Sequence, residues 1–163
     1  MESLFTAENT ILGIGNIILS DEGFGVRVVE YLEKNFNFPD NVALIDGGTL
    51  GVELLHFVAG TRRLLIIDSI DGGVAAGTTF HLRGDEIKAH FAQKISAHEV
   101  GIQDVLTMLE LSGKKIPHVE LIGAQPFSLE AGVELTPRMS ELVPPFADKA
   151  AAILRSWGLE VTR

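Results

Sequence analysis

The stretch "GIGNIILSDEGFGV", residues 13–26, decides the fold. It follows an apolar run that starts at Thr10 and precedes a segment with helical spacing of its apolar residues. A glycine turn between a buried strand and a helix is typical of α/β sheets that bind phosphate at the helix N-terminus. Here Asp21 and Glu22 stand where a phosphate would lie, so the stretch is either a poor anion site or a site for a cation.

Apolar runs and helical patterns alternate along the rest of the chain. Continuously apolar strands that alternate with helices indicate a mostly parallel sheet covered on both faces. We therefore predict an α/β fold, a three-layer sandwich with a twisted sheet of about five strands. The predicted strands are 10–16, 42–48, 63–70, 78–84 and 118–126, with helices near 22–35, 50–59, 85–92, 96–113 and 137–157. The alternating segment 78–84 follows a turn-rich stretch and is predicted as an edge strand.

Local signals mark the ends of two of these helices. Ser96 and Glu99 match a capping box, and Gly113 is a candidate C-cap of the same helix. The pair Pro144–Pro145 is expected to interrupt the last helix, which follows Pro137.

Length and composition limit the class of protein. The 163 residues suit a single domain over 1–163, in which we expect residues 1–9 to be a flexible N-terminal extension. The net charge is −9, and basic residues cluster no further than the pairs Arg62–Arg63 and Lys114–Lys115. Nucleic acid and anionic membranes are therefore poor partner candidates. The sequence lacks a signal-peptide pattern and any apolar run of roughly 18–20 residues, so we expect a cytoplasmic protein. Because no obvious coiled coil or exposed apolar helix stands out in the sequence, we expect a monomer.

The absence of cysteine removes several kinds of chemistry. Disulfides, thiolate metal sites and a cysteine nucleophile are all excluded.

Acidic residues follow two of the main predicted strands. Ligands of parallel α/β sheets bind at the carboxyl ends of the strands. The residues at these ends are Asn16, Asp46, Asp68 and the segment 123–125. Asp68 is either a loop cap or a group that meets a cation, because a carboxylate after an apolar run is costly without a partner. Asp46 precedes Gly47 and Gly48, which fits an Asx-turn as well as a functional carboxylate.

The acids of the opening stretch also have two interpretations. Both can complement the dipole of the first helical turn. We favour this explanation for Asp21. For Glu22 it is weaker, because its loop borders the same crevice as Asp46 and Asp68.

His98 is the most informative of the five histidines. If Ser96 caps a helix, His98 lies in the first turn, where the helix dipole disfavours the charged imidazolium. A neutral imidazole is the form that binds a metal. The alternative is a partly exposed histidine at a helix start. We interpret the other four as structural or exposed: His56, His81, His90 and His118.

Several catalytic and nucleotide-binding templates fail. Ile18 stands where a dinucleotide fingerprint needs its third glycine, and Ile102 where a zincin helix needs its second histidine. The chain also lacks a phosphate-binding P-loop, the G-x-S-x-G motif and the D-[ST]-G motif of aspartic proteases. One glutamate, one or two aspartates and one histidine at a strand-end crevice remain, a donor set that suits Ni²⁺ or Zn²⁺.

Five blocks of the sequence together resemble the hydrogenase maturation endopeptidases. The blocks are "GIGNIILSDEGFGV", "DGGT", "LLIIDSI", "KISAHEVG" and "GAQPFSLE", in the order and spacing of that family and across most of the chain. The resemblance implies an enzyme that removes a short C-terminal peptide from the large-subunit precursor of a nickel–iron hydrogenase after nickel insertion. The resemblance also implies that the cut follows a basic residue of the precursor, usually histidine.

The same resemblance implies the site residues. The metal-binding positions of the family correspond to Glu22, Asp68 and His98, and Asp68 is also a candidate catalytic carboxylate. Asp46 lies in the "DGGT" block, which implies a role in recognition or catalysis. Nickel is expected to arrive with the precursor, and zinc or cadmium ions are expected to be able to occupy the same site.

Two alternatives to this function remain open at the level of sequence. A non-catalytic nickel checkpoint or chaperone would bind the precursor without cutting it. A nucleotide-binding protein on a similar sheet is disfavoured by the acids in the glycine loop. Within the enzyme hypothesis, the nickel either licenses cleavage as a recognition element or acts as a Lewis acid.

Overall fold

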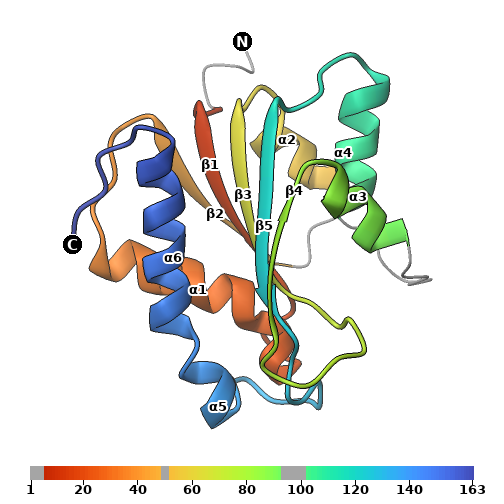
Figure 1. Ribbon diagram of the computed structural model, residues 1–163, viewed down its shortest axis with the longest axis vertical. Helices are drawn as coiled ribbons and strands as arrows, with labels where there is room; N and C mark the ends of the chain where they lie inside the picture. Colours follow the sequence, from red (N-terminus) through yellow and green to blue (C-terminus); the bar gives the residue numbers. More distant parts are fainter. Residues whose placement is uncertain (1–5, 49–51, 93–101) are drawn as a thin grey trace.

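Five strands form one sheet in the order β2-β1-β3-β5-β4 (Figure 1). The computed structural model describes residues 6–48, 52–92 and 102–163. The strands are β1 (Asn9–Ile14), β2 (Val42–Gly48), β3 (Arg63–Ser69), β4 (Thr79–Arg83) and β5 (His118–Ala124). All neighbours pair in parallel except β4, which is antiparallel to β5 at one edge. The predicted mostly parallel sheet is confirmed, and so is the edge strand.

Helices cover both faces of this sheet, as predicted. They are α1 (Phe24–Asn35), α2 (Leu55–Val58), α3 (Asp85–Ala92), α4 (Ile102–Leu111), α5 (Pro137–Ser140) and α6 (Val143–Ser156). In Figure 1, α1 and α6 lie on one side of the strands, and α2, α3 and α4 lie on the other. Alternation along β3 supplies both cores, because Leu65 and Ile67 face α1 and α6 while Leu64 and Ile66 face the other layer.

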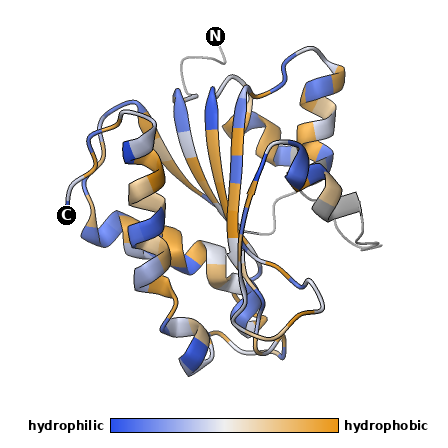
Figure 2. Cartoon of the chain, in the orientation of Figure 1, coloured by the Kyte–Doolittle hydropathy of each residue, from blue (hydrophilic) through white to orange (hydrophobic). Residues whose placement is uncertain are grey.

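Hydrophobic residues line the contacts between these layers. Figure 2 shows them along the central strands and on the sides of the helices that face the sheet. In α1, the fully buried residues Phe24, Val28 and Leu32 are spaced four apart and therefore share one face of the helix. The Phe24 ring packs edge-on against Phe146 of α6, with 4.9 Å between the ring centroids. This contact joins the first and last helices over the same face of the sheet.

The first turn of the helix predicted near 22–35 is a separate 3-10 helix, η2 (Ser20–Gly23), which runs directly into α1. The helix predicted near 50–59 is also short, because only η3 (Val52–Leu54) and α2 are helical in the described part of that segment. The predicted capping box of Ser96 and Glu99 lies outside the described residues. Gly113 does follow the end of α4 in the left-handed region, with φ +76°, as predicted for a C-cap.

The prolines near the end of the chain begin a helix instead of interrupting one. α5 ends at Ser140 and α6 starts at Val143, so Pro144 and Pro145 lie in the first turn of α6. Backbone N–H groups in a first turn have no partner within the helix, and proline is therefore tolerated there. The predicted break in the 137–157 helix exists, but it precedes the proline pair.

The N-terminal segment becomes part of the fold earlier than predicted. β1 already includes Asn9, and the Glu8 carbonyl accepts hydrogen bonds from the backbone N–H groups of Arg62 (2.8 Å) and Arg63 (3.2 Å). These bonds hold the chain beside the start of β3. The extension predicted over residues 1–9 is therefore too long at its C-terminal end, and residues 1–5 lie outside the described part.

A buried carboxylate ties the antiparallel edge strand to the rest of the molecule. Glu120 of β5 is almost fully buried. It accepts hydrogen bonds from four side chains, which are His81 and Arg83 of β4, His118 of β5 and Trp157 at the end of α6. Burial raises the pKa of Glu120, but these four hydrogen bonds outweigh burial and lower the pKa to about 2. His81 and His118 are thus structural, as predicted.

This lowered pKa predicts a specific loss of stability in acid. Because the pKa of Glu120 is lower in the folded than in the unfolded protein, its ionised form stabilises the fold above pH of about 4.5. That contribution, on the order of 3 kcal/mol, is lost as the pH falls toward 2. We expect Glu120→Gln to lower the free energy of unfolding at pH 7 by urea denaturation, and the deficit to shrink below pH of about 4.5. The exposed control Glu33→Gln should show neither effect, and a constant deficit at all pH values would contradict the assignment.

Candidate functional site

The glycine turn after β1 packs closely against η2. β1 ends at Ile14, because Gly15 turns the chain with φ +133°. A β-carbon at Gly15 would lie 1.8 Å from the Glu22 carbonyl oxygen. The glycine is therefore required by close contact between the turn and η2.

A second glycine brings α1 onto the sheet. A β-carbon at Gly25 would lie 2.0 Å from the Ile67 carbonyl oxygen and 2.5 Å from that of Ile14. Only glycine allows a helix to approach two strand backbones this closely. The consequence is that η2, directly before α1, is held at the carboxyl ends of β1 and β3.

Glu22 reaches the end of β3 from this position. Its side chain is half-buried, and its Oε2 lies 3.4 Å from the Ser69 hydroxyl, which donates to it. Ser69 is the last residue of β3 and directly follows Asp68. The structure therefore brings Glu22 to the same strand end as Asp68, as predicted from the sequence.

Asp68 lies at the carboxyl end of β3, opposite Gly123 of β5. A β-carbon at Gly123 would come within 2.5 Å of the Asp68 carbonyl oxygen, so glycine is required beside it. Asp68 is half-buried near the carboxyl end of a largely buried strand. Asp68 shares its face of the strand with Leu64 and Ile66, on the side of α2, α3 and α4.

Asp46 lies at the same edge of the sheet but apart from Asp68. It pairs with Gly13 of β1, which in turn pairs with Ile67 of β3, so β1 separates the two aspartates. Two strand spacings amount to roughly 10 Å. Alternation also directs Asp46, which is exposed, to the face of α1 and α6. The two aspartates therefore do not form the adjacent pair that a shared proton requires.

The predicted three-ligand metal site is only partly visible. Among the described residues, no three His, Cys, Asp or Glu side chains are grouped so as to hold a metal ion. His98, the third predicted ligand, lies outside the described ranges. The set of Glu22, Asp68 and His98 therefore stays a prediction, in which two members reach one strand end.

The structure gives Asp21 another role than the predicted complement to the helix dipole. Its side chain is fully buried. Its carboxylate accepts hydrogen bonds from the backbone N–H groups of Phe127 (2.9 Å), Ser128 (3.1 Å) and Thr136 (2.8 Å), and from the Thr136 hydroxyl. Asp21 thus anchors the β5–α5 loop onto η2. No local pattern could have indicated this role, because the partners of Asp21 are more than a hundred residues away in the chain.

Gln125 also has a structural role that the sequence did not indicate. The sequence marked it only as part of the strand end 123–125. It is buried, and its side-chain carbonyl accepts from the backbone N–H groups of Gly72 (2.7 Å) and Val74 (3.4 Å). Its amide nitrogen donates to Asp71 at 3.0 Å. Gln125 therefore holds the loop between β3 and β4 at the carboxyl edge of the sheet.

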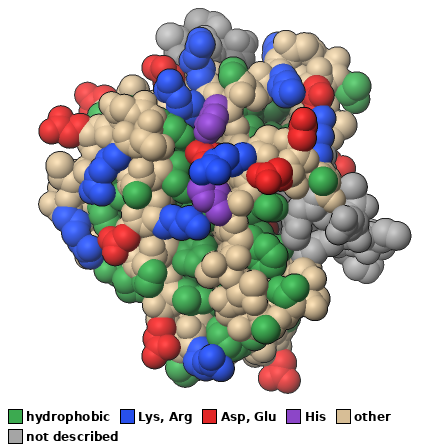
Figure 3. Space-filling view, viewed as in Figure 1, with side chains coloured by type: hydrophobic (Ala, Val, Ile, Leu, Met, Phe, Trp, Pro, Cys, Tyr) green, Lys and Arg blue, Asp and Glu red, His purple; other side chains and the backbone are tan. Residues whose placement is uncertain are grey.

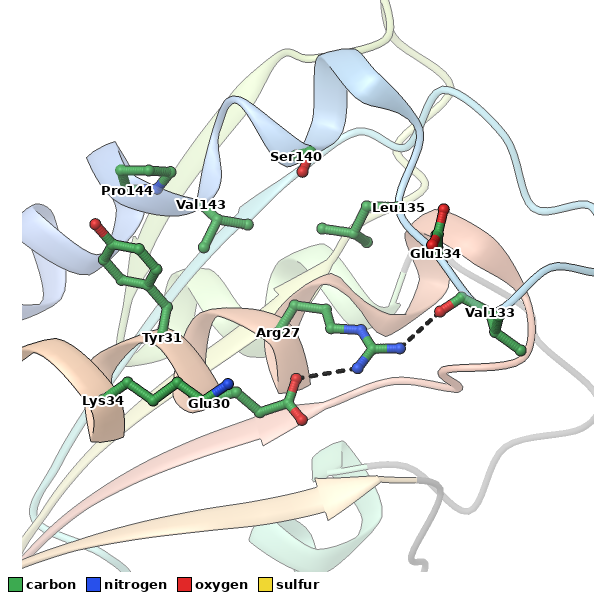
Figure 4. A pocket seen from close by; sticks show the side chains of 10 residues that line it. All are labelled: Arg27, Glu30, Tyr31, Lys34, Val133, Glu134, Leu135, Ser140, Val143 and Pro144. Carbon is green, nitrogen blue, oxygen red and sulfur yellow. Dashed lines mark hydrogen bonds and ion pairs between the residues drawn. The ribbon is translucent and has the colours of Figure 1, made fainter.

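A surface groove lies beside α1, and neither Glu22 nor Asp68 is among the described residues that line it. It encloses about 590 Å³ between α1 and the segment that leads into α5 and α6. Figure 4 shows Tyr31, Leu135 and Val143 on its apolar side, and Arg27 bridging Glu30 and the Val133 carbonyl. Arg27 therefore fixes one wall of the groove to the β5–α5 loop.

The environment of Asp21 predicts a large effect of a small substitution. Asp21→Asn replaces an oxygen acceptor by an amide donor that faces buried N–H groups, so at least one of them loses its partner. We expect the free energy of unfolding to fall by about 2 kcal/mol or more. The matched control is Asp148→Asn, because Asp148 is exposed and pairs only with Arg163 among the interactions described for it. Urea denaturation measures both, and equal stability of the two variants would contradict the anchoring role.

Comparison with known proteins identifies the family of this chain. A family model described as HycI, hydrogenase maturation protease, matches residues 26–153. The hydrogenase expression/formation protein HupD of Bradyrhizobium diazoefficiens is 41% identical over 155 residues, which cover 94% of this chain and 81% of that protein. The Hydrogenase 2 maturation protease of Escherichia coli K12 is 42% identical over 151 residues and 92% of each chain.

The solved structure of the hydrogenase maturating endopeptidase HybD from Escherichia coli superposes with a TM-score of 0.90. It is 41% identical in sequence, and the match covers 95% of this chain and 96% of that one. The resemblance predicted from the five sequence blocks is confirmed. The chain belongs to the family of hydrogenase maturation proteases.

Proposed function

We propose that this protein is an endopeptidase that removes the C-terminal peptide of a nickel–iron hydrogenase large-subunit precursor after nickel insertion. The observation that carries this function is membership of the hydrogenase maturation proteases over nearly the whole chain. The position of Glu22 beside the end of β3 agrees with it, because an acidic crevice suits a metal-bearing substrate better than an anion.

Glu22, Asp68 and His98 are the proposed contacts to the nickel that the precursor carries. Carboxylate oxygens and a neutral imidazole nitrogen are donors that Ni²⁺ and Zn²⁺ accept. The fit of Glu22 is supported by its half-buried position at the strand end, where the Ser69 hydroxyl orients its carboxylate. Asp68 directly precedes that serine. Zinc or cadmium ions are expected to bind to the same three residues.

Different residues of this protein would have different roles in the hydrolysis of the peptide bond. Bound at this site, nickel would supply a Lewis acid beside the scissile peptide. Glu22, Asp68 and His98 would orient the metal-bearing end of the precursor. Asp46, exposed and about two strand spacings from Asp68, would contact the peptide chain or accept a proton. Asp68 remains the second candidate for the catalytic carboxylate.

The cellular location and the oligomeric state of the protein also belong to the proposed function. No helix in the described ranges is long and apolar enough to span a membrane. The cytoplasmic location and the monomeric state expected from the sequence stay predictions.

Substitution of the proposed contacts should abolish cleavage. We expect Glu22→Ala, Asp68→Ala and His98→Ala each to lower the rate of peptide release from nickel-loaded precursor by at least about a hundredfold. Mass spectrometry of the precursor C-terminus before and after incubation measures that release. Asp46→Asn should lower the rate as well, if this carboxylate accepts a proton.

Matched control variants distinguish these effects from a general loss of folded protein. His56 and Glu33 are exposed and lie on α2 and α1, so His56→Ala and Glu33→Ala should leave the rate unchanged. Wild-type rates in all three contact variants would overturn the site assignment. A precursor that keeps its peptide while forming a stable complex with the wild-type protein would instead favour the non-catalytic checkpoint.

Chelation distinguishes nickel on the substrate from nickel resident in the enzyme. The enzyme is dialysed against EDTA, and the EDTA is then removed. If the precursor brings the metal, this enzyme should cleave nickel-loaded precursor at the rate of untreated enzyme. The same enzyme should not cleave nickel-free precursor. Loss of activity after dialysis, with recovery on addition of Ni²⁺ or Zn²⁺, would show instead that the enzyme holds its own metal.

A further inference from the structure

Two loops far apart in the sequence form one continuous surface beside the candidate site. Residues 16–20 follow β1, and residues 128–134 follow β5. The Gly132 backbone N–H donates to the Ile18 carbonyl (3.0 Å), and the Ser20 N–H donates to the Gly132 carbonyl (2.9 Å). The Ser20 hydroxyl also donates to the Glu130 carbonyl. The two segments therefore run side by side like neighbouring strands, with Leu19 and Gly132 forming a parallel bridge.

Large hydrophobic side chains are exposed on both loops. They are Ile17 (42% exposed), Ile18 (59%), Leu129 (43%) and Val133 (67%), which we name the apolar platform. These are four of the eight large hydrophobic residues that are exposed in the described part of the chain. Single exposed apolar residues are ordinary, but several on two hydrogen-bonded loops indicate an interaction surface.

The platform is rigidly supported from beneath. The buried Asp21 carboxylate holds both ends of the second loop, through Phe127 and Ser128 at one end and Thr136 at the other. Arg27 of α1 donates to the Val133 carbonyl at 2.7 Å, as Figure 4 shows. A surface that is ordered before binding loses less conformational entropy when a partner docks. The fold thus holds exposed apolar side chains in place, although they contribute little to its own core.

The platform is continuous with the candidate site. Ile17 and Ile18 lie on the segment that leads into η2, which carries Glu22. Figure 3 shows hydrophobic side chains across the lower part of the molecule, at the end of the sheet where the carboxyl ends of the strands lie. A protein whose chain end reaches Glu22 would therefore have these loops close beside it.

The charges around the platform favour a partner with basic groups. Glu130 and Glu134 lie on the second loop, and Glu22 and Asp68 lie at the neighbouring strand ends. The nearby Arg27 is already bonded to Glu30 and to the Val133 carbonyl. An apolar centre with an acidic border matches an apolar partner surface that carries lysine, arginine or histidine at its rim.

We propose that the apolar platform of Ile17, Ile18, Leu129 and Val133 is the docking surface for the body of the hydrogenase large-subunit precursor. This inference rests on the proposed function, and it adds the surface that binds the folded precursor outside the cleaved segment. Docking there places the precursor's C-terminal segment at the carboxyl ends of β1 and β3. The platform thereby contributes affinity, and the acidic site contributes the chemistry.

Charge substitutions on the platform test this proposal. Ile18→Glu and Val133→Glu should each raise KM for nickel-loaded precursor at least tenfold and leave kcat unchanged at saturation, because neither residue touches the reacting groups. The Kd of the precursor, measured by calorimetry, should rise by the same factor. Leu111→Glu is the matched control, since Leu111 is 82% exposed at the far end of α4, next to the opposite edge of the sheet.

The possible outcomes lead to distinct conclusions. Wild-type KM and Kd in both platform variants would overturn the proposal, and so would equal losses in the Leu111→Glu control. A fall in kcat without a change in Kd would also overturn it, because the residues would then act on the chemistry. If the wild-type protein releases no peptide, the proposed endopeptidase fails, but the Kd values still decide whether the platform binds the precursor. Ile18→Ser and Val133→Ser replace the charged variants if urea denaturation shows that those are unstable.

Discussion

The close approach of α1 to the sheet is the constraint on which the rest of the site depends. Gly25 lets the first turn of α1 touch the backbones of β1 and β3, where any side chain would collide with the Ile67 carbonyl. Gly15 lets the preceding turn lie against η2. Together these two contacts bring η2 to the carboxyl ends of the central strands. The glycines therefore act through helix–sheet distance, and they place a carboxylate where related sheets place a phosphate.

Asp21 and Glu22 are neighbours in sequence, but Asp21 has a structural role and Glu22 lies at the candidate site. Their surroundings explain the difference. Asp21 points inward, where four hydrogen bonds compensate for the burial of its charge. Glu22 lies half-buried at the strand end, with the Ser69 hydroxyl beside it. A single 3-10 turn thus uses one acid to fix the β5–α5 loop and presents the other at the candidate site. Because the two are adjacent, the position of Glu22 depends on the anchor that Asp21 makes.

The sequence predicted the parts of this structure that depend on local patterns. Apolar runs such as 63–70 identified the strands to within two residues, and the alternating 78–84 identified the edge strand. The predicted position of Asp68 at the carboxyl end of β3 is correct, because the carboxyl ends of parallel strands lie at one edge of the sheet. The role of Asp21 and the four partners of Glu120 were missed. Both depend on contacts between residues far apart in the chain, which neither periodicity nor a short motif encodes.

The acidity of the carboxyl edge has a consequence for selectivity under the proposed function. Glu22 and Asp68 lie at the end of the same strand, and two ionised carboxylates at one strand end repel each other. A cation carried into this edge relieves that repulsion, whereas a precursor without metal leaves it in place. The energy gained on binding therefore depends on whether the substrate is loaded. An enzyme with a resident metal would have neutralised these charges already and would lose this means of distinguishing the two precursors.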